Sequence, residues 1–132
     1  MKKNVIIFLC GFLSSTTIII SAFLILNPIY KGYRSDAALM MGSSSFDKKE
    51  YIPAISYLTL SIDNKPDNHS SHFLLAKCFE ELKRYDLALE MYETAYNIVN
   101  DSLEKGKIEK VYEFDRDKIK IDMEELKKKL SK

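Results

Sequence analysis

Apolar and polar residues divide the chain into three segments of different character. Val5 to Leu26 is a run of 22 residues without a charge, and a helix of that length spans roughly 33 Å. Residues 35–102 carry apolar positions at helical spacing. That spacing predicts helices over 36–46, 50–63, 69–82 and 85–99. Charged residues dominate from Asp101 onward. The chain is therefore predicted to be all-α.

The charge-free segment predicts a single transmembrane helix, because ~30 Å is the thickness of a bilayer's hydrocarbon core. Residues 1–27 would form a signal-anchor, followed by a short linker over 28–34. Asn27-Pro28 is expected to end the helix, since proline disfavours α-geometry in the residue before it. The alternative is a cleaved signal peptide, which needs a shorter apolar run and small residues before the cut. Ile20 stands three residues before the best candidate cut and favours the anchor.

Basic residues flank the apolar run on both sides. Lys2 and Lys3 precede it, and Lys31 and Arg34 follow it. This balance gives only a weak orientation signal. The Met-Lys-Lys start resembles a bacterial signal-anchor whose N-terminus stays inside. We therefore expect a single-pass protein of the bacterial inner membrane with its body outside the cytoplasm.

The middle of the chain repeats itself at an offset of 34 residues. Residues 35–68 align with residues 69–102 without a gap. The identical pairs are Lys49 and Lys83, Tyr51 and Tyr85, Ala54 and Ala88, and Asp67 and Asp101. Apolar and small residues also recur in phase, as at Met41-Gly42 and Leu75-Ala76. A period in this range is typical of helical repeat proteins.

The repeated pattern resembles the tetratricopeptide repeat, a 34-residue helix–turn–helix unit. The second copy fits best, with Ala88, Tyr92 and Ala95 as the family's small-large-small stripe. Small residues there let two helix backbones approach closely. The first copy is looser, although Pro66 stands at the family's terminal proline. The resemblance implies a short solenoid of two repeats.

The charged segment over 103–132 is predicted to be a helical cap on the last repeat, which solenoids require. Asp101–Glu104 has the pattern of a capping box that opens a new helix. A narrow apolar seam follows, formed by Ile119, Met123, Leu126 and Leu130. The alternative is a partner-binding or coiled-coil helix.

Charge and composition exclude several classes of function. The formal net charge is +1, which rules out the broad basic surface of a nucleic-acid-binding protein. No phosphate-binding loop or catalytic motif is present in the sequence, so we expect no enzyme and no cofactor. His69 and His72 lie three residues apart, but a metal site needs a third ligand. Cys10 and Cys78 lie too far apart for an internal disulfide.

In the tetratricopeptide family, the first helix of each repeat lines a concave groove. The resemblance places eight residues there: Leu39, Ser43, Phe46, Asp47, Phe73, Lys77, Glu80 and Glu81. The mixture of apolar and charged residues favours a docked protein segment. The alternative is that these residues contact the C-terminal helix.

The predicted function is that of a membrane-anchored scaffold that binds a membrane protein or a membrane-proximal subunit, with residues 5–26 in the bilayer. The alternative is a cytosol-facing receptor for targeting segments or chaperones.

Overall fold

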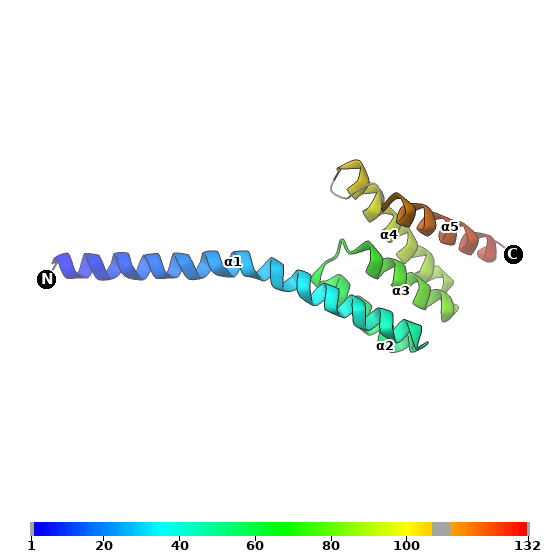
Figure 1. The fold of residues 1–132 in the computed structure, drawn as a ribbon, viewed down its shortest axis with the longest axis horizontal. Coiled ribbons are helices and arrows are strands. Elements are labelled where there is room, and N and C mark those ends of the chain that lie inside the picture. Colours follow the sequence, from blue (N-terminus) through cyan, green and yellow to red (C-terminus); the bar gives the residue numbers. More distant parts are fainter. Residues whose placement is uncertain (1, 107–111, 132) are drawn as a thin grey trace. The chain divides into compact units, whose positions relative to one another are not determined.

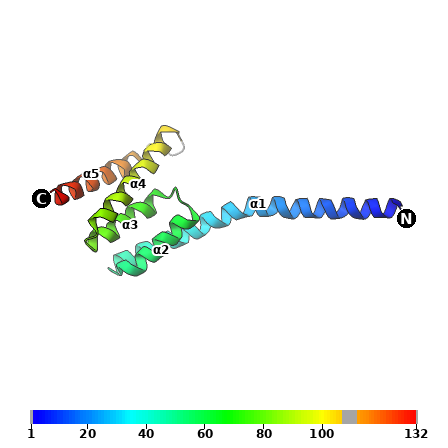
Figure 2. The ribbon, with the colours of Figure 1, turned by 180° about the vertical axis from the view of Figure 1, so that it is seen from behind.

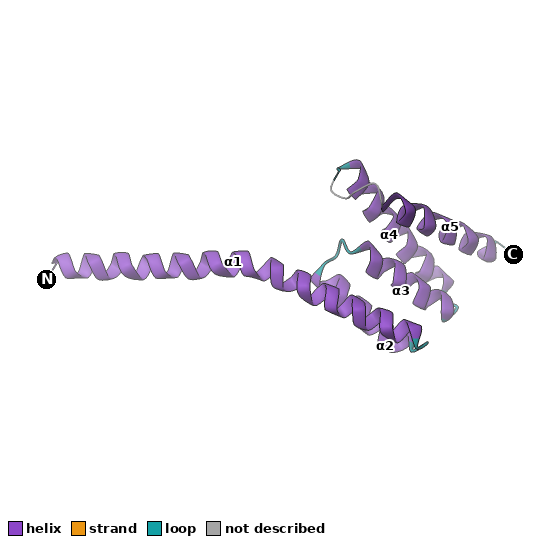
Figure 3. Ribbon diagram, viewed as in Figure 1, coloured by secondary structure: helices purple, strands orange, loops and turns teal. Residues whose placement is uncertain are grey.

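The described residues form helices joined by short loops. A computed structural model describes residues 2–106 and 112–131 (Figure 3). The helices are α1 (Lys2–Asp47), α2 (Tyr51–Asn64), α3 (His69–Glu81), α4 (Tyr85–Glu104) and α5 (Glu113–Leu130). The predicted all-α class is therefore confirmed for the described residues. Residues 1, 107–111 and 132, which belong to the predicted anchor and C-terminal segment, lie outside the described residues.

The chain divides into two compact units, Met1–Tyr33 and Arg34–Lys132. Helix α1 contains Pro28, so the prediction that the helix ends at Asn27-Pro28 is wrong. Residues 28–34 are helical and do not form an extended linker. The physical reason is that proline removes one N–H donor while its fixed φ of about −65° is itself helical. A long helix can therefore continue through it.

The described side chains of the first unit are mostly apolar and exposed. More than half of the surface is exposed at Ile18, Ile19, Ile20, Phe23, Leu24, Ile25, Leu26 and Ile29. The hydroxyl of Ser21 donates a hydrogen bond to the carbonyl of Ile18 at 2.9 Å, which satisfies it within the helix. Among the described residues, none of the helices combines the length and the apolar character that crossing a membrane requires.

The second unit contains two helix–turn–helix pairs whose turns have the same geometry. Lys49 and Lys83 both adopt a left-handed backbone, with φ of 61° and 58°. The N–H of Glu50 donates to the carbonyl of Ser45 at 2.9 Å, and that of Arg84 donates to Phe79 at 2.8 Å. Such bonds satisfy carbonyls at a helix end. Because the two turns lie 34 residues apart, the structure repeats at the offset found in the sequence.

The helices of the second unit pack in chain order. Helix α2 contacts α3, α3 contacts α4, and α4 contacts α5 (Figures 1 and 2). Ala88, Tyr92 and Ala95 are fully buried between these helices, as the small-large-small pattern predicts. A second cluster joins α2 to α3 through Leu58, Leu75 and other buried residues.

A close approach explains the glycine in the first helix pair. A Cβ atom at Gly42 would lie 2.8 Å from the Cγ and Cδ2 atoms of Leu58. Leu58 is fully buried, so it has little room to move. Gly42 thus allows α1 to approach α2 despite its low helix propensity.

Polar side chains join the first three helices beneath the loop between α2 and α3. The Ser61 hydroxyl lies 2.9 Å from the Ser35 hydroxyl and 2.7 Å from the Ser71 hydroxyl. The Asn68 amide donates to Ser35 at 3.3 Å. All three serines are fully buried. Because a buried hydroxyl without a partner is costly, this network fixes how the three helices meet.

The predicted capping box at Asp101–Glu104 does not open a new helix. These residues form the last turn of α4, which ends at Glu104. Asn100 donates to the Glu104 carboxylate at 2.7 Å, and Lys105 pairs with Asp101. The chain then turns at Gly106, where φ is 62°. The acidic residues extend α4 because its apolar face continues to Leu103, which packs on the core.

Gly42→Ala is expected to destabilise the second unit by about 1 kcal/mol, because overpacking typically costs ~1–3 kcal/mol and helix propensity returns only ~1 kcal/mol. The matched control is Gly32→Ala in the same helix, where an added Cβ meets nothing within 4 Å. Chemical unfolding of the detergent-solubilised chain, followed by circular dichroism, measures both. Equal stability of the two variants would contradict the packing argument.

Candidate partner-binding face

The first four predicted groove residues lie on the C-terminal part of α1. Leu39 and Phe46 are half-buried and pack against the cluster between α2 and α3. Ser43 is half-buried, and Asp47 is exposed. The Phe46 and Tyr51 rings meet edge to face, with centroids 5.7 Å apart. This part of the predicted groove is only partly covered.

The other four predicted groove residues lie on α3, and most of them contact other parts of the chain. Phe73, Lys77 and Glu80 approach α5, as the alternative interpretation predicts. Glu81 is exposed and accepts a hydrogen bond from the Tyr51 hydroxyl at 3.3 Å. The eight residues therefore do not line one open groove, because α5 occupies the part formed by α3.

Helix α5 packs through the apolar seam found in the sequence. Ile119 is 2% exposed, Met123 is 8% exposed and Leu126 is fully buried. These residues join the cluster of Tyr92 and Val99. Leu130 is 49% exposed, so its predicted place in the seam is wrong. It lies at the last residue of the helix, beyond the contact.

Ion pairs border this apolar contact. The Lys77 ammonium lies 3.0 Å from Asp122, and the Lys129 ammonium lies 2.7 Å from Glu80. The Asp122 oxygen Oδ2 is buried and has no hydrogen bond of good geometry. Its charge is instead met by Lys77 and by Lys118 at 3.8 Å. Asp122 and Lys129 belong to the charged C-terminal segment and pair with residues of α3, so these two pairs favour one register of α5.

Tyr92 and Glu80 form the polar centre of the contact. The Tyr92 hydroxyl donates to the Glu80 carboxylate at 3.0 Å, and burial raises the pKa of that phenol far above its ordinary value. Burial also acts to raise the pKa of Glu80. Hydrogen bonds from Lys129 and Tyr92 and the charge of Lys77 outweigh it, so the Glu80 pKa lies below its ordinary value. Glu80 therefore stays ionised at neutral pH.

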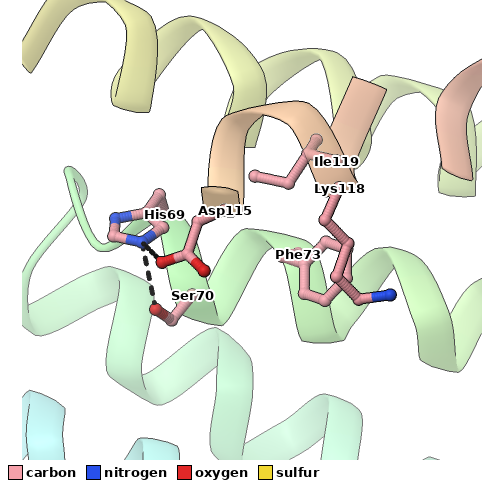
Figure 4. Close-up of a pocket in the computed structure, with 6 residues that line it drawn as sticks. All are labelled: His69, Ser70, Phe73, Asp115, Lys118 and Ile119. Atoms are coloured by element: carbon pink, nitrogen blue, oxygen red, sulfur yellow. Dashed lines mark hydrogen bonds and ion pairs between the residues drawn. The ribbon is translucent and has the colours of Figure 1, made fainter. Parts of the chain in front are cut away.

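A small cavity lies between the first turns of α3 and α5 (Figure 4). Its volume is about 90 Å³, and its lining includes His69, Ser70 and Asp115. The His69 nitrogen Nε2 lies 3.3 Å from the Ser70 hydroxyl and 3.7 Å from the Asp115 carboxylate. A catalytic triad uses one histidine nitrogen for the nucleophile and the other for the acid. Here both partners face the same nitrogen, so the arrangement does not support nucleophilic catalysis.

Sequence reasoning missed this His69–Asp115 contact because the two residues belong to different predicted segments and form no motif. Burial lowers the pKa of His69, while the charge of Asp115 acts to raise it. The Tyr112 ring meets the His69 ring edge to face at 5.8 Å. The residues thus anchor the start of α5 to the start of α3.

His72, the other histidine considered as a metal ligand, is buried beside the loop between α2 and α3. Its nitrogen Nε2 lies 2.9 Å from the Pro66 carbonyl, to which it donates. The two histidines have separate partners. Within the described residues, no group of three or more His, Cys, Asp and Glu side chains is placed to hold a metal.

No protein-family model matches this chain, and no curated protein matches it. The resemblance to the tetratricopeptide repeat therefore depends on the residues of the chain itself.

Glu80→Gln is expected to weaken the acid sensitivity of the fold. The Glu80 pKa is lowered in the folded state, so its stabilising effect is present above the unfolded value of about 4.3. It is lost as pH falls through the lower folded pKa. The variant should be less stable than the parent at neutral pH and should lose less stability between about pH 5 and pH 3.

The matched control is Glu81→Gln, which changes an exposed neighbour. Urea unfolding at several pH values gives the free energy of unfolding of each variant. If Glu80→Gln and Glu81→Gln show the same pH dependence, the bonds to Lys129 and Tyr92 do not stabilise the contact.

Proposed function

We propose that this protein is a non-enzymatic, membrane-anchored adaptor of the tetratricopeptide type. It binds a protein segment on its repeat face and so helps to assemble or stabilise a membrane or cell-envelope complex. The supporting observation is the packing of α5 across α3 and α4. Helix α5 of the chain itself thus indicates what kind of segment a surface of this type binds.

The contact made by α5 indicates the chemistry of a partner segment. It buries an apolar seam, including Ile119 and Leu126, and its charged border pairs with Lys77 and Glu80. A helix with one apolar stripe and charged flanks is a common ligand of helical grooves. A second surface suited to such a helix adjoins it on α1. It combines apolar and polar residues, namely Leu39, Ser43, Phe46 and Asp47.

The proposed anchor is the charge-free segment over residues 5–26. The exposed apolar side chains between Ile18 and Ile29 support it, because lipid would remove them from water. We place the protein in the bacterial inner membrane, with its body outside the cytoplasm. Its partners are then membrane proteins or membrane-proximal subunits. Basic and acidic residues are nearly equal in number, which disfavours nucleic acid as a partner.

A photoreactive residue at Phe46 should crosslink to a specific protein in intact cells, because this position borders the free part of the groove. The matched control is Thr59, an exposed residue of α2 outside the predicted groove. Affinity purification and mass spectrometry identify the adducts. The groove proposal fails if position 46 captures no specific protein. It also fails if positions 46 and 59 capture the same proteins equally.

Protease digestion of sealed membrane vesicles tests the location. In right-side-out vesicles the body should be cut, and in inverted vesicles it should be protected. The opposite pattern would favour a receptor that faces the cytosol and recognises targeting segments or chaperones. Release of the intact chain by carbonate washing would contradict an anchor of either orientation.

A further inference from the structure

The outer face of the first helix pair carries two exposed methionines. Met40 is 73% exposed and Met41 is 51% exposed on α1. They border a depression of about 400 Å³ that also includes Ser44 of α1 and Tyr57 of α2. Large apolar side chains gathered in this way mark an interaction surface.

The repeat itself shows what kind of neighbour this face takes. The positions 34 residues after Met40, Met41 and Ser44 are Leu74, Leu75 and Cys78. In α3 these residues face α2, where Leu75 is 6% exposed and Cys78 is fully buried. The same face of α1 is therefore built to receive a helix, and its residues are exposed in the single chain.

The two ends of the helix stack differ. At the C-terminal end, α5 covers the last pair and buries Ile119, Met123 and Leu126. At the other end, the surface around Met40 and Met41 is exposed. Pairing of two copies through this one face would close at a dimer, whereas head-to-tail stacking would meet the covered end. Two copies would also supply four repeats, and at least three are usually needed for a stable stack.

We propose that the face formed by Met40, Met41, Ser44 and Tyr57 binds the same face of a second copy of this chain. The charges at its border are suited to self-association. Lys48 and Glu50 both line the depression and carry opposite signs. In a twofold contact that sets Lys48 of one copy against Glu50 of the other, the same pair forms twice and the contact carries no net charge. The proposal goes beyond the scaffold function and does not depend on which protein the scaffold holds.

Disulfide formation in the full-length chain tests this contact. Cys10→Ser removes the cysteine of the apolar segment, and Cys78 is kept because it is buried, which raises the pKa of its thiol to about 11. In this background, Ser44→Cys should form a species of twice the monomer mass in oxidised membranes. The matched control is Ser56→Cys, on the exposed side of α2, which should stay monomeric.

Three further variants distinguish a specific contact from chance collision. Met41→Glu should abolish the disulfide at Ser44→Cys, and circular dichroism should show an unchanged helical content because Met41 is already half exposed. Lys48→Glu should weaken the disulfide, and Lys48→Glu combined with Glu50→Lys should restore it. Equal crosslinking at positions 44 and 56, or no disulfide at position 44, overturns the proposal. A disulfide to a different protein at position 44 also overturns it and leaves the scaffold proposal standing.

Discussion

Tyr92 is the residue on which the arrangement of the last three helices depends. Its ring is fully buried, lies 5.8 Å from the Phe73 ring and has the Lys77 ammonium 5.7 Å from its centroid. Its hydroxyl reaches Glu80, which also pairs with Lys129 of α5. A large ring between small residues brings helices together, and its hydroxyl requires a partner. Both requirements are met only when α3, α4 and α5 pack together.

The same contact limits which surfaces of the second unit stay exposed. Helix α5 covers the α3 part of the predicted groove, which leaves the surface on α1 for the proposed partner segment and, separately, the face around Met41 for the proposed second copy. The buried serines Ser35, Ser61 and Ser71 hold α1, α2 and α3 in register beneath these surfaces. The second unit therefore carries two partly exposed apolar areas, which support the proposal of a protein that works by association. The contacts of His69 with Asp115 and Tyr112 join the starts of α3 and α5.

Periodicity predicted the helices well where apolar residues face a core. Helices α2 and α3 begin and end within one residue of their predicted bounds. Errors occurred where a local signal competed with a longer helix, at Pro28 and at Asp101–Glu104. A proline or a capping pattern changes one or two hydrogen bonds, whereas a helix gains about one backbone hydrogen bond with each residue added to it. At the end of α4, Leu103 also packs on the core. Local signals therefore lose to helix continuity in this chain.

The sequence by itself determined the all-α class, the 34-residue recurrence and the seam on α5, because each depends on spacing along one helix. The spacing also marked Tyr92 and its small neighbours as core residues. Only the tertiary structure decided which face of α3 meets α5, that Glu80 serves Tyr92 and Lys129, and that Gly42 touches Leu58. These contacts join residues far apart in the chain, and their geometry depends on how helices cross in space.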